Sequence, residues 1–219
     1  MDLYALKRIK ILYSPYKKIK NHFESKKRNI AIKEYGYKML DDVCQNLKKS
    51  DLTVFCAYGT LLGFVRDNGF ISYDLDIDMG VIDDDFFSWE KLDDLLRDSG
   101  LKLHHQFVLD DGTITERTYY VGDATIDFFL FKKHKNYMSS LIYEREKYSK
   151  KFFVRVSEVP LIKEVIYIKK KNIEVPIIKN YEEFLVKVYG ENWKYPDPNF
   201  KHDERILDNR YAKMEFFKK

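Results

Sequence analysis

The chain has 219 residues, 45% of them hydrophobic and 16% aromatic, which is enough to bury a core and excludes a largely disordered chain. A net charge of +4 is too small to indicate a class of binding partner, and we expect no nucleic-acid partner. No apolar run reaches the length of a membrane-spanning helix. The two cysteines, Cys44 and Cys56, are predicted to be small core residues in a reducing compartment rather than disulfide or zinc ligands.

The first 29 residues form a basic and aromatic arm. Residues 1–33 carry ten Lys or Arg against two acids, a net of +8, so the remainder of the chain carries −4. We interpret the arm either as an amphipathic segment on an anionic membrane surface or as a solvated helix or subunit contact. Lys7, Arg8 and Lys10 interrupt the first apolar residues, which argues against a signal peptide. The predicted location is the cytoplasm, with the inner face of the membrane as the peripheral alternative.

Residues 30–49 are predicted to form a helix, because apolar side chains recur at helical spacing: Ile32, Met39, Val43 and Leu47. A continuous apolar run predicts a buried strand over Leu52–Ala57. Gly59 and Thr60 follow it, and a short apolar turn of helix leads to Arg66. Glycine after a strand allows a ligand to approach the backbone closely, and amides at a helix N-terminus suit a phosphate.

The most informative stretch is Tyr73–Val81, read as a strand with alternating faces. Asp74, Asp76 and Asp78 fall on one face, and the apolar residues between them fall on the other. Carboxylates at such positions repel each other. The stretch therefore predicts either a site for a hard divalent cation such as Mg²⁺ or a solvated, charged edge strand.

Three aspartates, residues 83–85, are predicted to cap a helix that runs to about Asp98 and stops at Gly100. Residues 101–109 and 113–121 are predicted to form a β-hairpin across an Asp-Asp-Gly turn. Two successive histidines in the first of these strands should point to opposite faces. We therefore expect them to be ordinary strand residues rather than a metal site.

The next strand, Ala124–Phe131, carries Asp127 among apolar neighbours. An unpaired buried charge is costly, so Asp127 should have a partner. It is either half of a buried salt bridge or a third carboxylate beside the earlier aspartates. Further on, the sequence predicts a hairpin over residues 165–175 and a helix from Asn180 to Gly190.

Several of these motifs follow one another in a specific order. The string Tyr-Gly-Thr-Leu-Leu-Gly-x-Val-Arg, then Gly-Phe-Ile, then Asp-x-Asp-Ile-Asp resembles the signature of the LicD family. That family includes bacterial phosphocholine transferases and the fukutin-related proteins. Ile126-Asp127-Phe128 resembles its third-carboxylate strand, and Tyr189-Gly190-Glu191-Asn192-Trp193 resembles its Tyr-Gly-x-x-Trp tail. The resemblance covers about residues 35–200.

The chain departs from the family pattern at two positions. Tyr73 replaces the usual Trp, and Leu75 replaces the middle Asp. Leu75 lies on the opposite strand face from Asp76 and Asp78, so the pair should survive. Leu75 puts in doubt only the contact, for example with substrate, that the carboxylate of the usual Asp would make.

The resemblance implies an α/β (α+β) single domain with a nucleotidyltransferase-like mixed β-sheet flanked by helices. Together with the charge pattern, it divides the chain into three parts: a basic arm (1–29), a LicD-like catalytic domain (30–200) and a polar C-terminal tail (201–219). The implied reaction, dependent on Mg²⁺ or Mn²⁺, transfers a phospho-alcohol group such as phosphocholine or phosphoribitol. The CDP-linked donor gives up this group to a hydroxyl of a glycan or lipid-linked glycan and releases CMP. The expected role is decoration or synthesis of a cell-surface polysaccharide.

The resemblance also implies roles for particular residues. Asp76, Asp78 and Asp127 are the expected catalytic residues and metal ligands, with Asp127 alternatively taking the proton of the acceptor hydroxyl. The expected donor-binding residues are Gly59, Thr60, Arg66 and Asp74. Arg66 is interpreted either as a phosphate clamp or as a structural ion pair with Asp67 or Asp74.

Two other functions remain compatible with the sequence. One is a nucleotidyltransferase that moves a nucleoside monophosphate from a nucleoside triphosphate and releases pyrophosphate. The other is a non-catalytic glycan-binding protein on the same fold.

Overall fold

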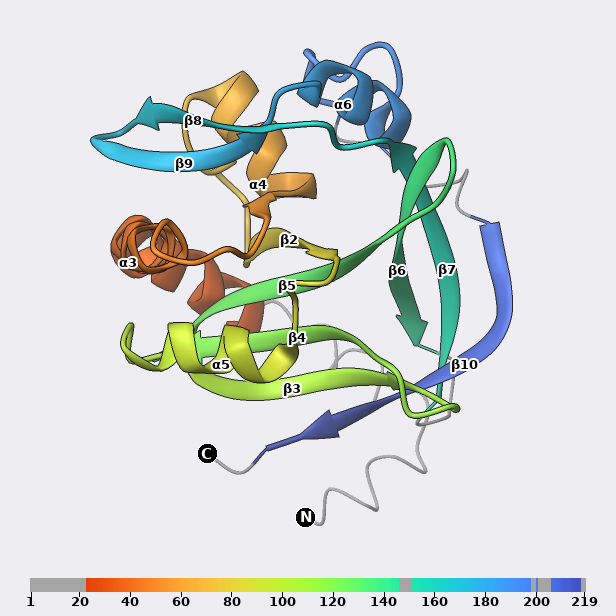
Figure 1. Ribbon diagram of the computed structural model, residues 1–219. Coiled ribbons are helices and arrows are strands. Elements are labelled where there is room, and N and C mark those ends of the chain that lie inside the picture. The colour runs from red at the N-terminus through yellow and green to blue at the C-terminus, as the bar shows by residue number, and fades with distance from the viewer. Residues whose placement is uncertain (1–22, 146–150, 198–199, 201–205, 218–219) are drawn as a thin grey trace, which may run out of the picture.

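A long N-terminal helix opens the described part of the chain. The computed structural model describes residues 23–145, 151–197, 200 and 206–217 (Figure 1). Residues 23–31 are helical and continue without a break through η1 (Ile32–Gly36) into α3 (Tyr37–Leu47). The helix predicted for 30–49 is confirmed, and its apolar stripe is buried: Ile32, Met39, Val43 and Leu47. Residues 23–29 of the predicted arm belong to this helix, whereas residues 1–22 lie outside the described residues.

The strands form one eight-stranded sheet and a separate hairpin. The sheet order is β1 (Val54–Cys56), β2 (Ile77–Asp83), β5 (Ala124–Lys133), β4 (Ile114–Val121), β3 (Lys102–Leu109), β10 (Ile206–Phe216), β7 (Lys151–Pro160) and β6 (Tyr137–Arg145). Strands β2 and β5 run parallel, and the other pairs among the described strands are antiparallel. Because β6 also pairs with β5, the strands from β5 round to β6 close into a ring.

Helices and the hairpin cover the sheet. Helix α4 (Tyr58–Leu62) follows β1 and runs into η2 (Gly63–Asp67). Helix α5 (Trp89–Arg97) lies over β3 and β4, and α6 (Tyr181–Tyr189) packs on β7 and beside α4 (Figure 1). The hairpin of β8 (Val165–Lys170) and β9 (Ile173–Ile178) packs against β1 and α3. No helix in the described ranges is both long and apolar enough to cross a membrane.

Two apolar clusters hold these layers together. The larger one joins β1, β2 and β5 to the helices, and its largest fully buried side chains include Phe55, Phe64, Phe128, Phe131 and Phe184. The smaller one joins β3, β7 and β10 through Phe107, Leu109, Val154 and Ala212. The larger cluster underlies β2 and β5, so it supports the strands that carry Asp78 and Asp127.

The predicted polar tail contains a strand that the sequence analysis did not predict. Residues 206–216 form β10, which pairs with β3 on one side and with β7 on the other. Ala212 is buried in the second apolar cluster while Leu207 is 55% exposed. Strand β10 therefore depends on contacts with strands far away in the sequence, and its own composition gives little indication of them.

The cap of α5 also differs from the prediction. Ser88, rather than residues 83–85, is the N-cap, and its hydroxyl accepts a hydrogen bond from the Lys91 amide at 3.2 Å. Asp83 ends β2, and the Asp84 carboxylate accepts a hydrogen bond from the Phe86 amide in the turn before the helix. These aspartates thus stabilise the turn that leads to the capping residue.

The prediction of a single mixed α/β domain is confirmed. The two predicted hairpins and the helix that ends before Gly190 are present, and the chain is a mixed α/β domain in which strands predominate. The ring of strands departs from the nucleotidyltransferase-like sheet that we expected. It arises because residues 137–145 and 151–160, to which we could assign no element from the sequence, form the paired strands β6 and β7, and β6 returns to β5.

Candidate active site

Asp78 and Asp127 lie side by side on the parallel strands β2 and β5. The register pairs Asp78 with Asp127, and it pairs the preceding Ile77 with Ile126. Both isoleucines are fully buried, so the alternation along each strand sends both aspartates to the opposite face. The pairing therefore brings together two of the three carboxylates that the sequence predicts to act together.

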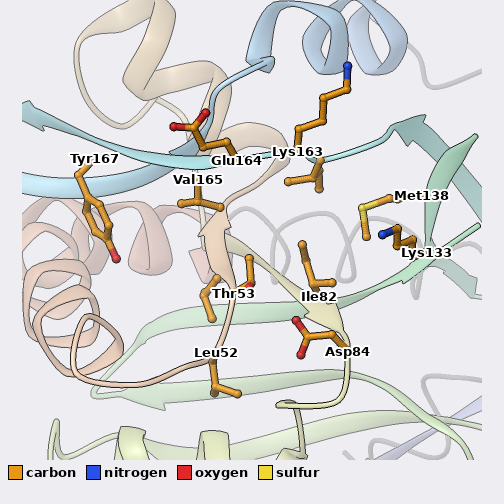
Figure 2. A pocket seen from close by; sticks show the side chains of 12 residues that line it. Leu52, Thr53, Ile82, Asp84, Lys133, Met138, Lys163, Glu164, Val165 and Tyr167 are labelled. Atoms are coloured by element: carbon orange, nitrogen blue, oxygen red, sulfur yellow. The ribbon is translucent and has the colours of Figure 1, made fainter.

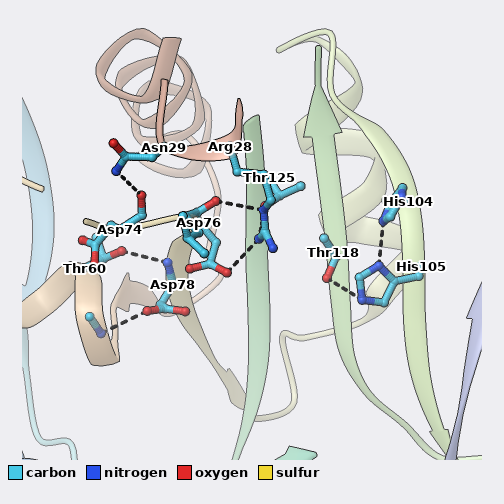
Figure 3. Close-up of polar contacts among 12 residues, drawn as sticks. Arg28, Asn29, Thr60, Asp74, Asp76, Asp78, His104, His105, Thr118 and Thr125 are labelled. Carbon is cyan, nitrogen blue, oxygen red and sulfur yellow. Dashed lines mark hydrogen bonds and ion pairs between the residues drawn. The ribbon is translucent and has the colours of Figure 1, made fainter. Parts of the chain in front are cut away.

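The turn after β1 holds Asp78 in place. The Thr60 hydroxyl accepts a hydrogen bond from the Asp78 amide at 2.7 Å, and the Gly59 amide donates to the Asp78 carboxylate at 3.0 Å (Figure 3). A Cβ atom at Gly59 would lie 3.0 Å from that carboxylate oxygen, so glycine permits the close approach. Gly59 and Thr60 thus contact a catalytic candidate directly. Their expected contact with the donor phosphates stays a prediction.

Tyr58 gives this turn its shape. Its backbone has a φ of +39°, which is unusual for a residue with a side chain and costs about 1–3 kcal/mol. The Tyr58 ring packs against Phe129 and Phe184, and its hydroxyl is hydrogen-bonded to Ser140. These contacts hold the strained conformation that aims the Gly59 amide at Asp78.

Asp74 and Asp76 precede β2 in a loop. The strand predicted to begin at Tyr73 begins at Ile77, because the Asp74 carboxylate accepts a hydrogen bond from the Ile71 amide at 2.9 Å and folds the loop back. The Asn29 side chain donates to the Asp74 carbonyl at 2.8 Å (Figure 3). The N-terminal helix therefore fixes the loop that presents the first two aspartates of the motif.

Asp76 forms an ion pair that sequence analysis missed. The Arg28 guanidinium donates to the Asp76 carboxylate at 2.9 Å and to the Thr125 hydroxyl at 3.1 Å (Figure 3). Its Nε donates to the Leu75 carbonyl at 3.2 Å. No sequence signal distinguished Arg28 from the other basic residues of the arm.

The carboxylates of the site repel one another in a largely half-buried setting. Burial raises the pKa of Asp78 well above its usual range, and the charges of Asp76 and Asp127 raise it further. Burial and the nearby Asp76 raise the pKa of Asp127 to about 7. Burial also raises the pKa of Asp74 to about 7. Glu116 of β4 is a fourth such carboxylate, whose pKa is raised by burial and then by Asp127 and Asp78.

The donor set suits a hard divalent cation. Asp127 Oδ1 is buried and has no hydrogen-bond partner in the described part of the chain, so one oxygen of this carboxylate is left for a ligand. Carboxylate oxygens are the ligands that Mg²⁺ and Mn²⁺ take in proteins. Among the described residues no three acidic, histidine or cysteine side chains stand together as a ready metal cluster. Asp76, Asp78 and Asp127 thus fit such an ion by their chemistry, and their side chains would have to turn toward it.

The Arg66 guanidinium forms an ion pair with the adjacent Asp67. Its Nε and Nη2 atoms donate to the two carboxylate oxygens of Asp67 at 2.7 and 2.8 Å. Only 10% of the Arg66 side chain is exposed. This arrangement is the structural ion pair that the sequence left open as an alternative to a phosphate clamp.

The two histidines lie on β3 as predicted, but their side chains do not point to opposite faces. A register shift between Leu103 and His105 breaks the alternation of β3, and the Nδ1 atoms of His104 and His105 lie 2.7 Å apart (Figure 3). His105 Nε2 lies 3.2 Å from the Thr118 hydroxyl, and Thr118 pairs with Asp127 across β4 and β5. The histidines therefore border the carboxylate site.

A cavity of about 480 Å³ lies away from the aspartates. It opens between the end of β2 and strand β8, and its lining includes Ile82, Asp84, Lys133, Lys163 and Tyr167 (Figure 2). None of the predicted site residues lines it. The cavity is thus separate from the candidate active site.

Comparison with known proteins agrees with the predicted resemblance. The family model described as LicD/FKTN/FKRP, nucleotidyltransferase domain, matches residues 51–176. The uncharacterized protein RT0683 of Rickettsia typhi is 27% identical over 158 residues, which are 72% of this chain and 45% of that protein. The human ribitol-5-phosphate transferase FKTN is 24% identical over 169 residues, 76% of this chain and 35% of that protein.

The chain spans less than half the length of these curated relatives. The segment that matches the family model covers more than half of the chain and includes Asp76, Asp78 and Asp127. The chain therefore belongs to the LicD family.

Proposed function

We propose that the chain is the catalytic domain of a transferase that moves a phospho-alcohol group from a CDP-linked donor to a glycan hydroxyl and releases CMP. The observation that carries the proposal is the in-register pair of Asp78 and Asp127, one of whose buried oxygens has no partner among the described residues. The name of the human relative supports a ribitol-phosphate-like head group. The family resemblance supports phosphocholine as the other candidate. The acceptor would be a glycan or lipid-linked glycan of the cell surface.

In this proposal Asp76, Asp78 and Asp127 hold Mg²⁺ or Mn²⁺. The bound ion would neutralise charge that develops on the donor phosphates. The acceptor hydroxyl oxygen forms a bond to the phosphorus distal to the nucleoside, and the bond from that phosphorus to the CMP oxygen breaks. The proton of the hydroxyl passes to a carboxylate. Asp127 takes this role in the alternative in which only Asp76 and Asp78 hold the ion, since in the metal-free protein its pKa is raised to about 7.

The turn at Gly59 and Thr60 would form one wall of the donor site. A Cβ atom at Gly59 would lie 3.0 Å from Asp78 and 3.8 Å from Asp74, so this glycine keeps the backbone close to both carboxylates. Asp74 is held by the Ile71 amide and sits beside Asp76 in the same loop. We therefore keep Gly59, Thr60 and Asp74 as donor-site residues.

A donor panel tests the proposal. The full chain is incubated with CDP-choline, CDP-ribitol or CTP, each with Mg²⁺ and with Mg²⁺ removed by chelation, and the products are separated. We expect Mg²⁺-dependent release of CMP from a CDP-linked donor, and loss of that release in Asp78→Asn. Pyrophosphate released from CTP would favour the nucleotidyltransferase. Metal-independent glycan binding without turnover of any donor would favour the non-catalytic protein.

A further inference from the structure

Arg28 places a cation of the protein itself at the carboxylate site. Its guanidinium makes three hydrogen bonds, to the Asp76 carboxylate, the Thr125 hydroxyl and the Leu75 carbonyl. The bonded oxygens belong to the loop before β2 and to β5, which supply two of the three candidate metal ligands, Asp76 and Asp127. The positive charge of Arg28 also lowers the pKa of Asp127, against the larger effect of burial. Arg28 therefore compensates part of the negative charge of the whole cluster.

Fixing the helix in place does not require this contact. The adjacent Asn29 side chain already donates to the carbonyls of Ser72 and Asp74, at 3.0 and 2.8 Å. Lys27 forms a further ion pair with Asp123 at 2.9 Å. The guanidinium contact with Asp76 therefore invites an explanation beyond docking of the helix.

The Asp76 oxygen that accepts the Arg28 hydrogen bond cannot also bind a divalent cation while Arg28 stays in place. The oxygen that accepts the Arg28 hydrogen bond is one of the two that Asp76 can offer to a metal. Like charges repel strongly at short range when solvent screens them poorly. The Arg28 side chain is 39% exposed, so its release from Asp76 into solvent does not require the fold to open.

We propose that Arg28 is an exchangeable counter-cation: it occupies Asp76 in the metal-free protein, gives way to a divalent cation, and then binds a phosphate of the donor. The inference rests on the proposed function, because it requires a metal and a phosphorylated ligand at this site. Mg²⁺ in such sites is usually shared between carboxylates and substrate phosphates, so a released guanidinium would lie next to a phosphate. The planar fork of arginine suits two phosphate oxygens.

Two binding measurements on the full chain test this exchange. Mn²⁺ affinity is measured by titration without nucleotide, and CDP affinity is measured at saturating Mn²⁺. In Arg28→Gln we expect Mn²⁺ to bind several-fold more tightly, because a competing cation is gone, and CDP to bind about tenfold more weakly, because a charge-assisted contact is lost. Arg28→Lys keeps the charge without the fork, so Mn²⁺ affinity should stay near wild type while CDP affinity falls. Lys27→Gln is the matched control, and it should change neither affinity.

The outcomes separate three accounts. If Arg28→Gln weakens Mn²⁺ and CDP binding together, Arg28 only positions the loop and the exchange is refuted. If Arg28→Gln changes neither affinity while wild type binds Mn²⁺, the exchange alone is refuted. If wild type binds no Mn²⁺, or Asp78→Asn binds it as well as wild type does, the proposed function is refuted and the exchange with it.

Discussion

Asp78 of β2 and Asp127 of β5 are direct partners in the register of two neighbouring parallel strands. Two half-buried carboxylates on one face of a sheet destabilise the fold when both are charged, unless something compensates them. Arg28 supplies part of that compensation through Asp76. The remaining negative charge is what the proposed divalent cation would neutralise.

The metal-free protein should lose stability as the pH rises from about 5 to 7.5. In this range Asp127, with its pKa raised to about 7, holds a proton in the folded state that the unfolded state releases. The slope from one such group is at most about 1.4 kcal/mol per pH unit. Urea unfolding of wild type and Asp127→Asn across this range should show a smaller loss in the variant.

His105 also makes the stability of the protein depend on pH, so the stability curve of wild type alone would mix its effect with that of Asp127. Burial lowers the pKa of His105 to about 4, so the histidine stays neutral in the fold, and its contribution to stability increases between pH 4 and 6.5. That contribution opposes the effect of Asp127 and is present in both proteins, so the difference between them reports Asp127 together with the carboxylates whose pKa it raises, Asp78 and Glu116. Parallel curves for wild type and Asp127→Asn would contradict the assigned pKa.

Gly59→Ala should impair metal binding with little change in stability. The new Cβ would lie 3.0 Å from the Asp78 carboxylate and push it away, whereas alanine is otherwise favourable in a helix. Mn²⁺ titration together with urea unfolding checks both expectations. Gly63→Ala is the contrast, since its Cβ would lie 2.5 Å from the Gly69 carbonyl and should mainly destabilise the fold. Unchanged Mn²⁺ affinity in Gly59→Ala would remove this turn from the site.

Arg66→Lys should lower stability by about 1 kcal/mol and leave CDP affinity unchanged, because it breaks the two-pronged bond to Asp67. Thermal unfolding and CDP titration in the presence of Mn²⁺ measure the two quantities separately. A fall of tenfold or more in CDP affinity with unchanged stability would restore Arg66 as a phosphate clamp.

The basic arm can be tested apart from the site. Residues 1–22 carry six Lys or Arg against one Asp. We expect full-length protein to co-sediment with anionic liposomes at low salt and to lose this binding on deletion of residues 1–22. Donor turnover should survive that deletion, because Arg28 and Asn29 remain. Equal binding to neutral liposomes would contradict the membrane interpretation.

Local patterns in the sequence predicted the elements that carry the site. Alternation placed Asp78 and Asp127 on strands, and Gly59 with Thr60 on the turn that meets them. The register that pairs the two aspartates could not be read, because parallel strands are aligned by the packing of the segments between them. The start of β2 was missed because the bond from the Ile71 amide to Asp74 favours a turn over a strand.

Residues that reach the site from a distance left no local signal. Arg28 lies 48 positions from Asp76 in the sequence. The charged residues around it are typical of a solvated helix. Glu116 lies on β4 and His105 lies on β3. His105 turns toward Thr118 because of a register shift between these two strands, and such a shift exists only once the strands have paired. Strand β10 was missed for the same reason, since its partners lie in β3 and β7.

Thermal unfolding of wild type and Asp127→Asn, with and without Mg²⁺ and CDP, tests the central claim most directly. We predict that wild type is stabilised by Mg²⁺ and CDP together, because ligands that bind the folded state raise its apparent stability. The metal-free variant should be as stable as wild type or more so, and it should lose most of that ligand response. If Asp127 were instead a buried salt-bridge partner, the variant would lose about 3–5 kcal/mol and keep the full response to Mg²⁺ and CDP. A destabilised variant with an intact response would contradict the assignment of Asp127 to a metal site.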